Sequence, residues 1–187
     1  MAREVQSELT IDAVPARGGA DVASGERSER TMLLVCLSAA AGLIHGKALI
    51  DHASHYWLFG VFFGVLTYAQ VLWAALVFRR PADRRWLMPA AVGSLAVVGV
   101  WLVSRTVGLP IGPWAGRPEP LAINDMTATL IELLLAALII AMLRPHGRIA
   151  ARMRWLDGAN CVRIGSMLVA LSLLGVLLGN HSHPGTG

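Results

Sequence analysis

Residues 32–50 read MLLVCLSAAAGLIHGKALI, and this stretch decides the fold. It is 19 residues long with Lys47 as its single charged residue, and an α-helix needs ~20 apolar residues to cross ~30 Å of hydrocarbon. Four more apolar blocks follow, with most charged residues between them: 56–78, 86–107, 123–143 and 159–179. Because a helix satisfies all of its backbone polar groups within lipid, we predict an all-α transmembrane bundle of about five spans.

The composition agrees with a membrane domain rather than a soluble one. Hydrophobic residues make up 55% of the 187-residue chain and charged residues 15%, whereas a soluble domain is about 45–50% apolar and about 25% charged. The sequence predicts a disordered cytoplasmic tail over 1–31, a transmembrane domain over 32–179 and a short extracytoplasmic tail over 180–187. Most arginines flank apolar blocks, so we expect contact with the lipid bilayer and no nucleic-acid partner.

Arginine is concentrated in two of the short loops, and this bias sets the expected orientation. The two loops join the second block to the third and the fourth to the fifth; their arginines are Arg79, Arg80, Arg84, Arg85, Arg144, Arg148, Arg152 and Arg154. Short loops rich in lysine and arginine stay on the cytoplasmic side. We therefore predict a multi-pass protein of the bacterial plasma membrane, with its N-terminus inside and its C-terminus outside.

Histidines collect on the side that this topology makes extracytoplasmic. Three of them lie at the outer end of the first span or just after it, and two lie in the C-terminal tail. Positions 45 and 52 differ by about 20° around a helix, so a helix that continues past residue 51 would aim three imidazoles at one pocket. Neutral imidazole binds copper or zinc, and a carboxylate can complete the shell. The predicted metal ligands are His45, His52, His55, Glu132, His181 and His183.

Three charged residues lie in the spans near the same membrane face. Arg105 lies near the end of the third span and Asp125 begins the fourth, with Glu132 about 10 Å further in. A charge at that depth costs several kcal/mol unless it is paired, so we predict an ion pair of Arg105 with Asp125 or Glu132. This pair either fixes helix packing or supplies a carboxylate to a metal, a proton path or a polar ligand. Glu132 is also the nearest carboxylate to His45 in depth, and Gln70 at mid-span predicts a hydrogen bond between helices.

Several stretches together resemble a known group of proteins. They read GLIHGKALIDHASHYWLFGVFF at 42–63, WLVSRTVGLPIGP at 101–113 and PEPLAINDMTATLIELLLAAL at 118–138, with Gln70 between the first two. In these stretches the chain resembles a group of actinobacterial multi-pass membrane proteins that have no established activity. The likeness runs roughly from His45 to Leu143 and implies a helical membrane architecture without implying a chemistry. It also implies a recurring pattern that includes His45, His52 or His55, Arg105 and Glu132.

Three functions remain open at this level. The leading interpretation is an extracytoplasmic histidine/carboxylate site that binds copper or zinc, either for metal handling or to assist a membrane redox enzyme. The second is a small transporter or channel component, working as a homo-oligomer, with a polar path lined by Arg105 and Glu132. The third is a haem b protein that uses two intramembrane histidines. The sequence has no Walker loop and no GxSxG, HExxH or CxxCH motif, so we do not favour an enzyme.

Overall fold

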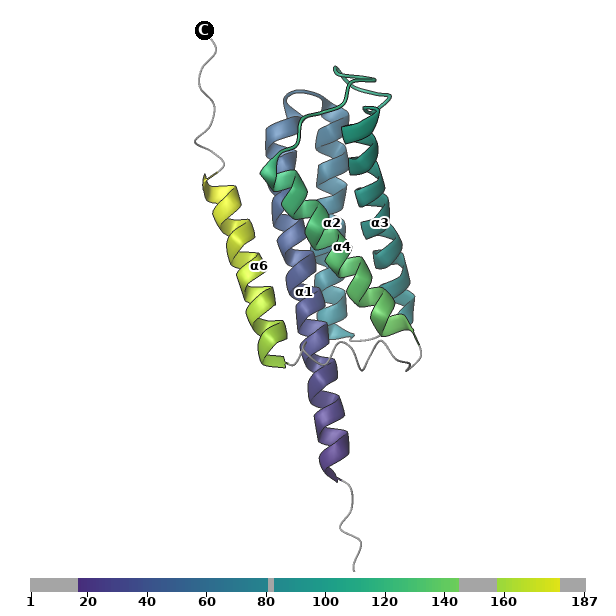
Figure 1. Ribbon diagram of the computed structural model, residues 1–187, viewed down its shortest axis with the longest axis vertical. Coiled ribbons are helices and arrows are strands. Elements are labelled where there is room, and N and C mark those ends of the chain that lie inside the picture. Colours follow the sequence, from purple (N-terminus) through teal and green to yellow (C-terminus); the bar gives the residue numbers. More distant parts are fainter. Residues whose placement is uncertain (1–16, 81–82, 145–157, 179–187) are drawn as a thin grey trace, which may run out of the picture.

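The chain folds as a helical bundle (Figure 1). The computed structural model describes residues 17–80, 83–144 and 158–178. Across these residues it has five α-helices and no β-strand: α1 Arg17–Ala53, α2 Trp57–Arg79, α3 Arg84–Thr106, α4 Ile123–Leu143 and α6 Gly158–Leu178. The predicted all-α architecture is confirmed.

Four of the helices are long and apolar enough to cross a membrane. They are α2, α3 and α4 over their whole lengths and Ser28–Ala53 of α1. The fifth predicted span corresponds to α6, in which the shorter apolar stretch Arg163–Val176 is described. The chain is therefore a multi-pass membrane protein.

The first helix starts earlier than the sequence indicated. α1 begins at Arg17 rather than at Met32, so residues 17–31, which we expected to be disordered, are helical. Extending an existing helix fixes one residue for each new hydrogen bond and avoids the cost of nucleation. The apolar part of α1 therefore supports a polar extension, which projects beyond the other helices in Figure 1. Residues 1–16 and 180–187 of the two predicted tails lie outside the described residues.

The bundle is organised around α1. This helix contacts α2, α6 and α4, whereas α3 packs mainly on α4 and scarcely touches α2. Figure 1 shows α6 on one side of α1 and α4 crossing the bundle obliquely on its way to the far end of α3. We call the end that holds the α1–α2 turn and residues 107–122 the loop end. The opposite end, where Arg79 and Arg84 lie, is the arginine end.

Small residues let α1 and α2 approach closely near the loop end. Gly60 of α2 is buried against α1, and a Cβ atom added to it would lie 3.0 Å from the Cβ of Ala53. Further along the same interface Gly46 faces Thr67 and Gly42 faces Gln70. Close approach through small residues is the usual way in which helices associate in lipid. It brings the polar side chains of α2 against α1.

The segment 107–122 folds back over the loop end. Gly108 has φ +78°, and a Cβ atom there would lie 2.4 Å from the backbone nitrogen of Arg117, so only glycine fits. The amide of Glu119 donates to the carbonyl oxygen of Ser104 at 2.9 Å. The segment therefore returns to the end of α3 before α4 begins.

Candidate functional site

The most buried polar contact joins α1 to α4. His45 Nε2 lies 3.2 Å from Oε1 of Glu132, and the two residues are 4% and 0% exposed. His45 is eight residues before the end of α1 and Glu132 nine residues after the start of α4. At 1.5 Å per residue both lie about 12–14 Å from the loop end. Their positions in the sequence predicted a similar depth for the two residues, and the structure brings their side chains into contact.

A third helix contributes Gln70 to the same contact. Gln70 Nε2 donates to Oε1 of Glu132, so this carboxyl oxygen has two neighbours from two different helices. The backbone of Gln70 is held in turn, because its carbonyl oxygen accepts from Ser38 Oγ at 2.9 Å. The expected interhelical hydrogen bond of Gln70 is therefore present, with Glu132 as its partner. We call His45, Gln70 and Glu132 the central cluster.

Two oxygen atoms of the central cluster have no hydrogen-bond partner among the described residues. They are Oε2 of Glu132 and Oε1 of Gln70, and both are buried. Buried acceptors without donors are rare in folded proteins, because their desolvation is not repaid. A hydrogen-bond donor or a cation beside these two oxygen atoms would therefore stabilise the cluster.

The imidazole of His52 lies between the central cluster and the loop end. The ring of Phe63 contacts both imidazoles, with centroid distances of 6.0 Å to His45 and 5.3 Å to His52. His52 Nδ1 donates to the carbonyl oxygen of Ala48 at 2.9 Å, so Nε2 takes no part in that hydrogen bond. Thus His45 and His52 are both next to Phe63.

The third imidazole of the predicted metal set does not share this face. α1 ends at Ala53, so His55 lies in the turn before α2 and is exposed. Its Nδ1 donates to the carbonyl oxygen of Asp51 at 2.9 Å. We expected the helix to continue and aim three histidines at one pocket, and its early end prevents this. Within the described residues no group of three or more His, Cys, Asp or Glu side chains could hold a metal ion. His181 and His183 lie outside those residues.

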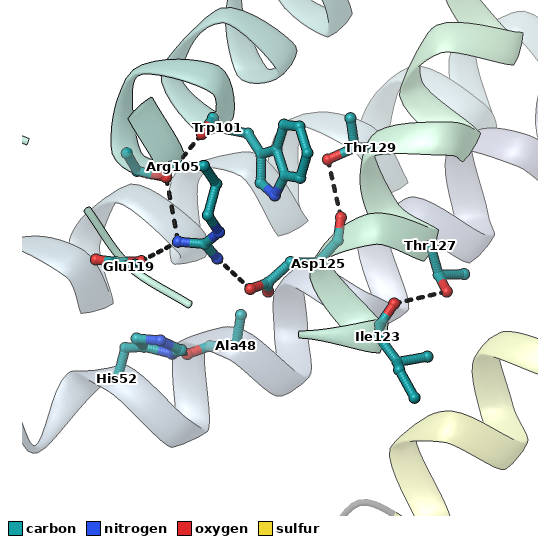
Figure 2. A network of polar contacts seen from close by, with 10 residues as sticks. Ala48, His52, Trp101, Arg105, Glu119, Ile123, Asp125, Thr127 and Thr129 are labelled. Carbon is teal, nitrogen blue, oxygen red and sulfur yellow. Dashed lines mark hydrogen bonds and ion pairs between the residues drawn. The ribbon is translucent and has the colours of Figure 1, made fainter. Parts of the chain in front are cut away.

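Arg105 is the centre of a second polar network, nearer the loop end (Figure 2). Its guanidinium forms ion pairs with Asp125 of α4 and with Glu119 of the returning loop. Of the two partners expected from the sequence, Asp125 contacts Arg105, while Glu132 contacts the other members of the central cluster. Figure 2 shows the indole of Trp101 beside this network. Its Nε1 has no partner among the described residues.

Glu119 was not predicted from the sequence as a partner of Arg105. The two residues are 14 positions apart, and only the return of the loop brings them together. The available signal was the glycine and proline content of 108–122, which indicates a tightly folded loop rather than an extended one. The network therefore fastens the loop to α3 and α4.

No family model, curated protein or solved structure matches this chain.

Proposed function

We propose that this protein of the bacterial plasma membrane binds and releases a proton at the central cluster. The observation that carries the proposal is Glu132, which is fully buried at bilayer depth and bonded from two other helices. Ionisable groups at such depth are costly to keep in lipid, and they commonly mark ion or proton paths. Carboxyl and imidazole groups are also the side chains that most often accept and donate protons in protein sites.

The surroundings of the cluster favour exchange with one side of the membrane. Toward the loop end, His45 is followed by Phe63 and then by the part-buried imidazole of His52. Toward the arginine end lies Ser38, which does not titrate and already donates to the carbonyl oxygen of Gln70, together with buried apolar residues including Leu37 and Leu135. The nearest titratable side chain outside the cluster, His52, is therefore on its loop-end side. With the predicted topology, the accessible side is extracytoplasmic.

The favoured form of the site is the one without net charge. A neutral imidazole and a carboxylate together carry one negative charge. When His45 and Glu132 share one additional proton, the pair therefore has no net charge. Removing that proton, or adding another, leaves a net charge in a medium of low dielectric constant. The resting site therefore holds one exchangeable proton, and its release requires a compensating change nearby.

Counting protons tests the proposal. Purified protein in liposomes would be titrated potentiometrically, alongside E132Q and the control D125N, over the pH range in which all three remain folded. We expect E132Q to release about one proton fewer per chain than the unmodified protein. D125N removes a carboxyl group from the Arg105 network and leaves the central cluster intact. Identical curves for E132Q and the unmodified protein would contradict the proposal.

A second candidate function is copper or zinc binding at the loop end. The observation that favours it is that His52 and His55 each have Nδ1 at 2.9 Å from a backbone carbonyl oxygen, to which Nδ1–H donates. Because the two imidazoles lie on different faces, each would bind a metal ion as a separate ligand. Metal-binding histidines usually donate one ring nitrogen in this way and bind through the other. Calorimetric titration of Cu²⁺ and Zn²⁺ into the unmodified protein and a double variant, H52A with H55A, tests this. Equal, weak binding to both proteins would rule out this second function.

The geometry gives less support to the other two interpretations, a transporter or channel component and a haem b protein. Arg105 and Glu132 belong to separate networks, so a polar path lined by that pair has no contact to support it. A haem with two histidine ligands needs imidazoles on opposite faces of the ring. His45 and His52 instead come from one helix and contact the same phenyl ring.

A further inference from the structure

We infer that Glu132 is held as a neutral carboxylic acid and that its Oε2–H donates to Oε1 of Gln70. The two side chains then form a cyclic acid–amide pair with two antiparallel hydrogen bonds. Gln70 is a positioning residue that keeps the proton on one particular oxygen. This inference deepens the proposed function and rests on it, because it says where the exchangeable proton resides.

The hydrogen-bond inventory of the cluster points to this arrangement. Four buried side-chain nitrogen or oxygen atoms of the described residues lack a partner, and two of them are Oε2 of Glu132 and Oε1 of Gln70. They belong to the same two groups that the Nε2–Oε1 bond already joins. A carboxylate has only acceptors, whereas a carboxylic acid has one donor. A single proton on Oε2 therefore provides the donor that both unpartnered atoms lack.

The alternatives leave the cluster worse satisfied. An ionised Glu132 would bury a full charge with Oε2 unbonded, next to an amide oxygen that is also unbonded. Turning the amide of Gln70 around would place its oxygen against Oε1 of the carboxyl group, so an acceptor would face an acceptor in the carboxylate and in an acid protonated on Oε2. With the acid form, His45 donates from Nε2 to Oε1, and all three side chains are neutral.

The other charged groups of the bundle do not compete for this proton. His45 is the titratable residue bonded to Glu132. Arg105 and Asp125 pair with each other nearer the loop end. From α2 the cluster receives Gln70, which does not titrate. The protonation of Glu132 is therefore set by burial and by its two neighbours in the cluster.

Infrared spectroscopy of the protein in lipid bilayers tests the inference at neutral pH. A neutral carboxylic acid has a carbonyl band that is separate from carboxylate bands and shifts in heavy water. We expect such a band in the unmodified protein, its loss in E132Q and its retention in D125N. In Q70L the band should move to higher frequency, because the acid loses its acceptor. If Q70L does not fold, Q70N keeps an amide and breaks the two-point geometry, so the same upward shift is expected.

The outcomes separate the inference from the proposed function. Absence of a band that depends on Glu132 would show an ionised carboxylate and overturn the inference. A band whose frequency is the same in the Gln70 variants would overturn the acid–amide pair. In either case the proton count of E132Q still decides the proposed function. Conversely, a band that persists unchanged at every pH would support the pair while contradicting proton exchange.

Discussion

Replacing Glu132 by two residues of similar size separates the neutral acid from a carboxylate. E132Q preserves the length of the side chain and the carbonyl oxygen that accepts from His45 and Gln70. If Glu132 is already neutral, this change removes no charge, and we expect the free energy of unfolding to change by less than ~0.5 kcal/mol. E132L removes both accepted bonds and the bond that the acid donates to Gln70, and it leaves two buried donors and one buried acceptor without partners.

The size of the second effect follows from the number of bonds lost. Side-chain hydrogen bonds within membrane proteins average ~0.6 kcal/mol and reach ~1.7 kcal/mol. Three bonds lead to an expected destabilisation of about 2–5 kcal/mol for E132L. The assay is reversible unfolding in mixed micelles, with increasing detergent denaturant monitored by circular dichroism and tryptophan fluorescence.

Two results would refute this reasoning. Equal destabilisation of E132Q and E132L would mean that the charge of a carboxylate contributes to folding, contrary to a neutral acid. No loss of stability in E132L would mean that the bonds to His45 and Gln70 contribute nothing measurable. The control is L133A, at an exposed position next to Glu132 on α4, which should cost little in either case.

Three further predictions concern packing, the loop and topology. G60A should destabilise the protein by about 1–3 kcal/mol, because its new Cβ lies 3.0 Å from that of Ala53. The control G99A, whose new Cβ has nothing within 4 Å, should leave stability unchanged, and comparative unfolding checks both. R105Q should cost about 1–3 kcal/mol and expose the loop to proteolysis, since two part-exposed carboxylates lose their partner; unchanged protection would contradict this. Reporter fusions after Arg85 and after Gly187 should report cytoplasmic and external locations, and a cytoplasmic C-terminus would overturn the topology.

The helices could be predicted from the sequence because each apolar block is longer and more uniformly apolar than a helix of a soluble protein requires. Depth could also be predicted, since counting residues from the span ends placed His45 and Glu132 at one level. The rotation of each helix could not be predicted, because helices that are apolar all round have no single face that must be buried. The sequence therefore indicated that Gln70 would bond another helix without indicating Glu132 as its partner.

The predicted convergence of His45, His52 and His55 on one pocket was wrong because of where α1 ends. Its geometry depended on α1 continuing past residue 51 far enough to include His55, and α1 ends at Ala53. No strong stop signal such as glycine or proline lies at 54–56, so the end could not be located from local pattern alone. The close packing of Gly60 against Ala53 requires the chain to reverse direction directly after Ala53. This requirement competes with a longer α1.

The central claim is that Glu132 holds an exchangeable proton within the bilayer. Its most direct test is the infrared carboxyl band of the protein in bilayers, recorded as the external pH is raised through the range in which the fold persists. We expect a band at neutral pH that disappears reversibly in alkali and is missing at every pH in E132Q. A protein that has no such band, or one whose band does not respond to external pH, would contradict it.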